Sequence, residues 1–396
     1  MSTKEEKVVN AILKYRNFLF LILVSVIALI MRLKLFSFQS YDFRIFLLPW
    51  YETIEKLGGI KALNTQVGNY GITYQTLIAL FTYLPFKPIV MYKFLSVCFD
   101  YVLAVGSALL VQALYDSQSK SLFLLVYSVI LFVPTVVMNS GLWGQCDSIY
   151  CSFIILSLLS LVKNKKIPSF IFLGVAFAFK FQTIFILPLY ILLYLRNKSF
   201  SILYFGVSFI SFYLCCLPGI IMGRNWLDPI RIYLGQIDET RINLLYPNLS
   251  GMMTQMNNGN IYNYQIMKSF LIFLTLAILL IGSYYLFVKD KVWTKDQIVV
   301  YGLWIIWTCV MFLPSMHDRY GYLVDILLVL LSFKYPILWI NTTFSILESW
   351  LVYVSGLFGI DINIQLLSFT AVLNYTYFTL VVFFNKYDKL LMKSIS

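Results

Sequence analysis

Charged residues are scarce in this chain, and histidine is almost missing. Asp, Glu, Lys and Arg make up only 12% of the 396 residues, and His317 is the single histidine. Soluble domains carry about twice that share of charge, so the composition excludes an ordinary soluble domain, and one histidine excludes a multi-histidine metal site. The six cysteines show no paired CxxC spacing, so no disulfide scaffold or zinc site is indicated.

Apolar residues are abundant instead. They form 60% of the chain, with 34 Phe and 29 Tyr, and the mean hydropathy is +0.81. We therefore expect an all-α polytopic membrane protein whose residues 1–396 form a single integral membrane domain. The net charge of +12 lies in short clusters between apolar runs, where the orientation of membrane spans explains it better than nucleic-acid binding.

The apolar runs predict about twelve transmembrane helices, because lipid leaves the backbone no other way to satisfy its hydrogen bonds. The first run is too long for a removable signal peptide and lacks a small-residue cleavage site, so we expect it to remain as a span. The twelve runs are residues 18–36, 90–114, 121–138, 148–162, 168–179, 183–195, 200–222, 266–288, 298–313, 320–333, 337–357 and 364–384.

Residues 71–86 are also apolar, and counting them as a span would reverse the orientation of everything that follows. We expect a re-entrant or interfacial segment here, because the basic clusters then gather on one side of the membrane, which should be the cytoplasmic side. Both termini are then cytoplasmic, and residues 37–89 and 223–265 form two long outer loops. The clusters are Lys163/Lys165/Lys166, Arg196/Lys198, Lys289/Lys291/Lys295 and Lys386/Lys389/Lys393.

The first outer loop contains an expected interfacial helix. Its apolar positions have helical spacing, and Pro49 should kink it. Asp42 and Arg44 lie at its start, and a plain N-cap is an equal alternative for Asp42. The predicted apolar stripe is Ile45, Leu48, Tyr51, Ile54 and Leu57.

Three further groups of polar residues lie where expected spans meet the outer side. Gln145 and Asp147 follow a Trp143-Gly144 turn, and Lys180 and Gln182 follow the fifth span. The alternative for the first pair is a capping loop, and the alternative for the second is a lysine that extends to the membrane surface. The third group is His317, Asp318 and Arg319, which can hold a phosphate or form a structural Asp-Arg pair in an aromatic belt.

Taken in order, these residues resemble the GT-C superfamily of membrane glycosyltransferases, which take a sugar from a polyprenyl-phosphate carrier. The likeness is closest to bacterial proteins related to the second mannosyltransferase of GPI-anchor synthesis, and more distant to the dolichyl-phosphate-glucose-dependent glucosyltransferases. It spans residues 15–335. It rests on Asp42 after the first span, Trp143-Gly144-Gln145-Cys146-Asp147-Ser148, Phe179-Lys180-Phe181-Gln182 and Met316-His317-Asp318-Arg319-Tyr320.

The resemblance implies an inverting transfer of mannose, glucose or galactose on the outer face of the plasma membrane, with a glycan or glycolipid as acceptor. Asp42 would be the catalytic base, and His317, Arg319 and Lys180 would bind the donor phosphate. No second acid adjoins Asp42, and Asp318 replaces the usual Glu, so a divalent cation is possible but unsupported and no metal site is predicted. The expected sugar-binding or acceptor-binding residues are Arg44, Gln145, Asp147, Gln182, Asn248 and Asp318.

Two other classes of function remain open. A polysaccharide polymerase would use arginines of the second outer loop, such as Arg224, Arg231 and Arg241. A flippase or transporter of lipid-linked sugars would place polar groups near the membrane midplane, whereas the polar motifs here lie at span ends. A membrane acyltransferase would need polar partners for His317 within a span, and the sequence shows none nearby.

Overall fold

The computed structural model describes residues 3–197, 200–236, 241–253, 261–289 and 292–384. Within these ranges every regular element is a helix, and the one departure is an isolated bridge between Leu244, Leu245 and His317. Several of the helices are long and apolar enough to cross a membrane. The chain is therefore an all-helical, multi-pass membrane protein, as its composition predicted.

Seven described helices are long and apolar enough to span a bilayer. An eighth span is possible where α5 (Lys120–Phe132) meets α6 (Pro134–Val137) and η3 (Met138–Trp143) at a bend of 55°. Pro134 explains the bend, because proline has no backbone N–H and disfavours a helical residue before it. The seven are α1 (Thr3–Leu35), α4 (Pro88–Leu114), α10 (Leu203–Ile221), α13 (Ile261–Lys289), α14 (Lys295–Phe312), α16 (Trp339–Phe358) and α17 (Ile364–Phe383).

The other four predicted spans also form helices, but short ones. They are 16, 14, 11 and 13 residues long, whereas a full crossing takes about 20. The number of twelve spans stays a prediction. These helices are α7 (Asp147–Val162), α8 (Lys166–Phe179), α9 (Leu187–Asn197) and α15 (Tyr322–Lys334).

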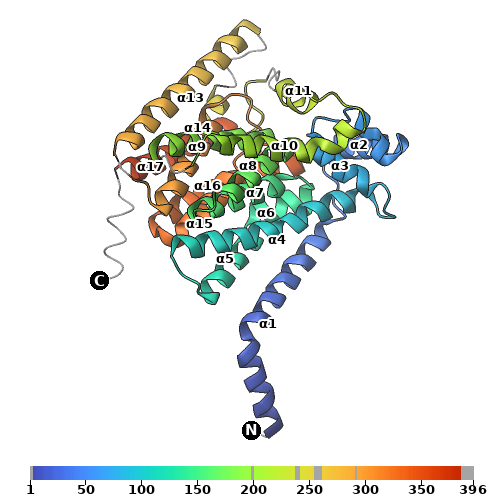
Figure 1. Cartoon of the computed structure of the whole chain (residues 1–396), viewed down its shortest axis with the longest axis vertical. Helices are drawn as coiled ribbons and strands as arrows, with labels where there is room; N and C mark the ends of the chain where they lie inside the picture. Colours follow the sequence, from blue (N-terminus) through green and yellow to red (C-terminus); the bar gives the residue numbers. More distant parts are fainter. Residues whose placement is uncertain (1–2, 198–199, 237–240, 254–260, 290–291, 385–396) are drawn as a thin grey trace.

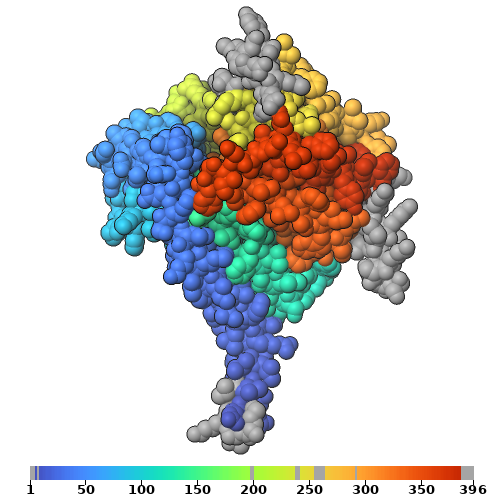
Figure 2. All heavy atoms as spheres, turned by 180° about the vertical axis from the view of Figure 1, so that it is seen from behind, coloured from blue at the N-terminus to red at the C-terminus, as the bar shows by residue number. Residues whose placement is uncertain are grey.

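The helices form two packed groups. In one, α4 packs against α7, α7 against α8 and α8 against α10; in the other, α14 to α17 pack together and α13 lies against α14 (Figure 1). Helix α14 is the most enclosed span and buries Trp304 and Trp307. A capping box at Thr294 and Gln297 starts it. Helix α1 leaves the body and carries the N-terminus away from it (Figures 1 and 2).

The first loop contains a helix at the expected place. It begins with a π-helical turn, η1 (Phe43–Leu47), and continues as α2 (Leu48–Lys56). Phe43 and Leu47 are buried, whereas the predicted Ile45 and Leu57 are exposed. Exposure does not contradict the predicted stripe, because the apolar face of an interfacial helix lies against lipid, so the stripe stays a prediction. The π turn takes about one more residue than an α turn and so changes which of its side chains face the protein.

The rest of this loop does not cross the bundle. After η2 (Gly59–Asn64), helix α3 (Ile72–Phe81) has only ten residues. The Lys93 ammonium near the start of α4 donates hydrogen bonds to the carbonyls of Leu35, Phe36 and Phe38, at 2.9, 3.3 and 2.7 Å. The end of α1 and the start of α4 therefore lie at the same end of the helices, as a non-spanning 71–86 segment requires.

The second long loop also contains helices where it is described. It contains α11 (Asp228–Gly235) and α12 (Leu249–Met252), and α13 begins within it at Ile261. Residues 237–240 and 254–260 of this loop lie outside the described part of the chain. The same holds for Lys198, Lys291, Lys386, Lys389 and Lys393 of the predicted basic clusters.

Candidate functional site

Asp42 does not cap the helix that follows it. Its side chain makes no capping hydrogen bond; instead, Oδ2 accepts hydrogen bonds from Trp143 Nε1 at 3.0 Å and from Gln145 Nε2 at 3.2 Å. Ser40, two residues earlier, takes the capping position and accepts from the Phe43 N–H at 3.1 Å. The carboxylate of Asp42 is thus aimed across the chain at the Trp143–Gln145 turn.

That turn is shaped by a glycine in the left-handed region. Helix η3 ends at Gly144, whose φ is +77°, and the Gln145 N–H then bonds the Asn139 carbonyl at 2.9 Å. A side chain at position 144 would lie 3.3 Å from Lys93 Cγ. Lys93 therefore lies between the turn and the segment before Asp42, and contacts both.

Asp147 is the buried anchor of the site rather than part of its wall. It is completely buried and forms an ion pair with Lys180, while Asn139 Nδ2 donates to its Oδ2 at 2.8 Å. Arg319 Nε lies 3.4 Å from the same oxygen. A buried carboxylate needs such partners, and Asp147 lines neither cavity described below, so the structure does not support direct sugar binding by it.

Lys180 is buried and does not reach the surface. Helix α8 ends at Phe179, and extended backbone at Lys180 turns the side chain inward. Its ammonium is 5.2 Å from the ring centres of both Tyr150 and Tyr320. Gln182, 7% exposed, lies beside it with a buried Oε1 that accepts no hydrogen bond from the described residues.

The histidine segment is held by the second long loop. Backbone hydrogen bonds join Leu244 N to Met316 O at 3.1 Å, Asp318 N to Leu244 O at 2.9 Å and Ser315 N to Ile242 O at 2.7 Å. This pairing supports the strained turn at Ser315, whose φ is +59°. It presents three consecutive polar side chains to the interior, those of His317, Asp318 and Arg319.

The charges of this segment are coupled to Asp42 and Asp147. Burial raises the pKa of Asp318 to about 6; Asp42 and Asp147 add to that rise, and Arg319 opposes it. The Arg319 guanidinium lies 3.7 Å from Asp318 and 5.6 Å from the centre of the Trp143 ring. Arg319 thus contacts groups from two of the sequence motifs, its own segment and the Trp143–Ser148 turn.

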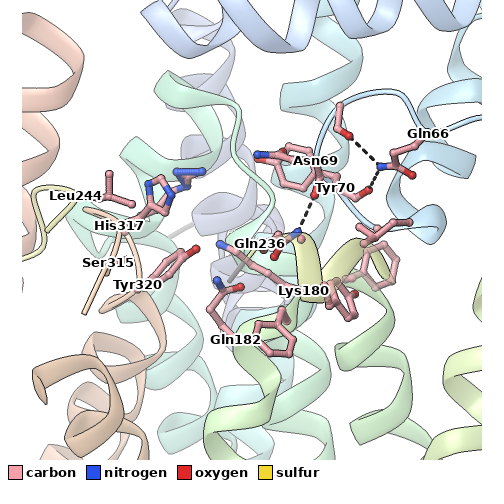
Figure 3. A pocket seen from close by; sticks show the side chains of 18 of the residues that line it. Gln66, Asn69, Tyr70, Lys180, Gln182, Gln236, Leu244, Ser315, His317 and Tyr320 are labelled. Atoms are coloured by element: carbon pink, nitrogen blue, oxygen red, sulfur yellow. Dashed lines mark hydrogen bonds between the residues drawn. The ribbon is translucent and has the colours of Figure 1, made fainter. Parts of the chain in front are cut away.

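Two adjoining cavities, of about 500 and about 610 Å³, lie among these groups. Asn69, Tyr70, Leu244, His317 and Arg319 line both and form the partition between them. Figure 3 shows the smaller cavity, with His317 and Tyr320 facing Asn69 and Tyr70. The smaller cavity is also lined by Lys180, Gln182 and Arg231, and the larger by Asp42, Trp50, Trp143, Gln145, Arg241 and Asp318.

Two predicted site residues lie elsewhere. Arg44 is exposed on η1 and lines neither cavity. Asn248 is fully buried and caps α12: its Oδ1 accepts from Gly251 N, and its Nδ2 donates to the Val310 carbonyl at 2.9 Å. The amide of Asn248 is thus engaged by the protein itself, and neither Asn248 nor Arg44 lines a cavity, so their expected sugar contacts are not supported.

Sequence analysis assigned no role to Tyr70, which lines both cavities in the structure. Its hydroxyl donates to Gln145 Oε1 at 2.8 Å, which orients the amide so that its nitrogen reaches Asp42. Asn69 and Tyr70 lie between Gly68 and Gly71, and this polar turn in an apolar stretch was the available signal. Its partner is 75 residues away in the chain, so no local pattern could reveal the contact.

Comparison with known proteins adds no relative. Neither the family models nor the curated proteins contain a match to this chain. Among the described residues, no group of three or more His, Cys, Asp or Glu side chains could hold a metal ion. The inferences below therefore rest on the geometry of the site.

Proposed function

We propose that this protein is a GT-C-type membrane glycosyltransferase, which moves a monosaccharide from a polyprenyl-phosphate donor to a glycan or glycolipid acceptor on the outer face. The observation that carries the proposal is the convergence of Asp42, Gln145, Lys180 and the 317–319 segment on two joined cavities. These residues are up to 277 positions apart (319 − 42). A fold that gathers them at one end of a membrane bundle incurs the cost of burying ionisable groups, which is typical of functional sites.

In the proposed reaction, Asp42 is the general base. It takes the proton of the acceptor hydroxyl as that oxygen attacks the anomeric carbon; the bond from this carbon to the phosphate oxygen breaks, and polyprenyl phosphate leaves with the electron pair. Trp143 and Gln145 both bind Oδ2, so Oδ1 is the atom available for the proton. One carboxylate suffices, since a phosphate leaves without being protonated.

The smaller cavity, on the side of the partition away from Asp42, has cationic side chains that fit the leaving phosphate. Among the described residues, the smaller cavity is lined by Lys180, Arg231, His317 and Arg319 and by no acidic side chain. Arg319 and His317 would stabilise the charge that grows on the phosphate. Lys180 is paired with Asp147, so its main contribution would be to hold that wall in place.

Replacing the base tests the proposal. We expect Asp42→Asn to lower transfer from a polyprenyl-phosphate sugar by about 10²–10⁴-fold while donor binding and thermal stability stay near wild type, because the amide keeps the shape and loses the basicity. Glu52→Gln, an exposed acid ten residues on, is the matched control and should transfer normally. Wild-type turnover by Asp42→Asn would make the mechanism wrong.

A polysaccharide polymerase is the second candidate, because Arg231 and Arg241 line the cavities. Arg224 does not join them: it is buried, and its guanidinium binds Gln75 Oε1 at 2.6 Å and the Leu63 carbonyl at 2.6 Å. A polymerase would retain activity in Asp42→Asn and lose it in Arg241→Ala. The same assays therefore separate the two functions.

A further inference from the structure

A second pair of cavities lies at the opposite end of the helices from Asp42. Helix α4 begins near Asp42 and ends at Leu114, at the end of the helices that carries these two cavities. Helix α5 begins at this same end, at Lys120. Helix α1 is tied to the bundle at mid-length: Ser25 Oγ and Tyr127 OH are 2.7 Å apart, and Tyr101 OH donates to the Ser25 carbonyl at 2.8 Å. Beyond this tie α1 diverges from the body (Figures 1 and 2).

The divergence opens a groove between α1 and α5. This cavity, about 380 Å³, has apolar walls formed by Phe18 and Leu21 of α1 and by Phe123 and Leu124 of α5. Its polar end is formed by Asn17, Gln112 and Lys120. Such a groove, with apolar walls and a lysine at its polar end, fits one acyl chain of a lipid with an anionic headgroup.

Gln112 also lines the neighbouring cavity, of about 340 Å³, together with Lys163, Lys295 and Asp116. Lys295 forms an ion pair with Asp116, which accounts for one positive charge. Lys120 and Lys163 form no ion pair with any described residue. Among the described residues, these two lysine charges thus have no ion-pair partner. Lys120 lines the apolar groove and Lys163 lines the cavity next to it, at the end of the helices that carries the basic clusters.

We propose that the α1–α5 groove, residues 17–21 with 120–124, binds one anionic phospholipid, whose phosphate lies against Lys120 with Lys163 nearby. Apolar walls alone do not distinguish one membrane lipid from another, because every lipid offers the same chains. The cationic end supplies the selectivity, as basic pockets between membrane helices do for acidic headgroups. The inference needs only that this end reaches the membrane surface, and it is independent of glycosyl transfer.

Photolabelling tests the position of the lipid. The purified full-length chain is placed in phosphatidylcholine nanodiscs with a trace of phosphatidylglycerol that carries a photoreactive acyl chain. We expect labelled peptides that contain residues 17–21 and 120–124, and competition by unlabelled phosphatidylglycerol but not by phosphatidylcholine. Lys120→Gln should weaken binding of phosphatidylglycerol about fivefold, and Lys120→Gln with Lys163→Gln further.

Lys61→Gln is the matched control, since Lys61 is an exposed lysine in the loop at the Asp42 end. It should leave phosphatidylglycerol affinity unchanged. Unchanged affinity in Lys120→Gln, or equal competition by phosphatidylcholine, would overturn the proposal. Competition by polyprenyl phosphate alone would also overturn it, because the groove would then hold the donor lipid. Leu124→Trp fills the groove without altering charge and should abolish the labelling.

Discussion

Three carboxylates with three different environments define the candidate site at the scale of single residues. Asp147 is buried against Lys180 and Arg319, and Asp42 is held by the neutral donors Trp143 and Gln145. The Oδ1 atom of Asp318 is buried and accepts no hydrogen bond from the described residues. Environments that differ in this way separate the roles of chemically equal groups. Asp147 is structural, Asp42 is the candidate base, and Asp318 is the group whose charge changes near pH 6.

Asp318 should make folding depend on pH. Its pKa is about 6 in the folded chain and about 3.9 when unfolded, so the folded state binds more protons between these values. Stability from this group is therefore complete below about pH 3.9 and is lost as the pH rises through 6, by up to roughly 3 kcal/mol. Asp318→Asn cannot ionise, so wild type should lose stability relative to this variant between pH 4.5 and pH 7.5.

Chemical unfolding of both proteins in one detergent at the two pH values measures this difference. The exposed Asp361 supplies the control, and Asp361→Asn should follow wild type at both pH values. A stability difference between wild type and Asp318→Asn that does not change with pH would mean that the carboxyl is hydrated in the folded chain.

At the scale of helices, the close packing of α8 against α10 depends on a small residue. Gly174 of α8 faces α10 so closely that an added Cβ would lie 2.1 Å from the Ser208 carbonyl oxygen. Small residues allow such backbone contact between membrane helices. Since α8 ends at Phe179, directly before Lys180, the contact between α8 and α10 helps to determine the position of Lys180.

Gly174→Ala should therefore destabilise the protein by about 1–3 kcal/mol, because the obstructing atom belongs to the backbone and the helices must move apart. Gly206→Ala is a matched control on α10, since no atom lies within 4 Å of its added Cβ, and it should leave stability unchanged or slightly raised. Thermal unfolding in detergent compares the two variants. Equal melting temperatures would mean that the α8–α10 crossing is wider than described.

At the scale of the whole molecule, polar chemistry and basic clusters occupy opposite ends of the bundle. The cavities lie at the end where α1 finishes and α4 starts. Lys163 and Lys295 lie at the other end, where Lys295 pairs with Asp116 after α4. The positive-inside rule then predicts that the cavities open to the outside.

Lysine labelling in intact cells tests this orientation. A membrane-impermeant amine reagent should modify Lys61 and Lys87, which are exposed at the cavity end, and should leave Lys120 and Lys163 unmodified until the cells are permeabilised. The exposed lysines at the two ends serve as controls for each other. Labelling of Lys163 but not of Lys61 in intact cells would reverse the orientation and place the cavities inside.

Much of this architecture could be predicted from the sequence, because lipid forces apolar runs into helices and polar residues in such a chain are few and conspicuous. The twelve apolar runs, the helix after Asp42 and the grouping of Asp42, Gln145, Lys180 and His317 were accessible in this way. The burial of Phe43 and Leu47 against the protein was not, because the π turn changes the helical period without a sequence signature.

The sequence by itself determined that the chain is a helical membrane protein with its polar motifs at helix ends, since both follow from hydropathy and from the cost of charge in lipid. Only the tertiary structure decided which polar groups touch a cavity. Asp147 became an anchor, Asn248 a helix cap and Tyr70 the residue that orients Gln145. Those roles depend on contacts between segments far apart in the chain, which no periodicity relates, and on packing that leaves some polar groups satisfied and others facing open space.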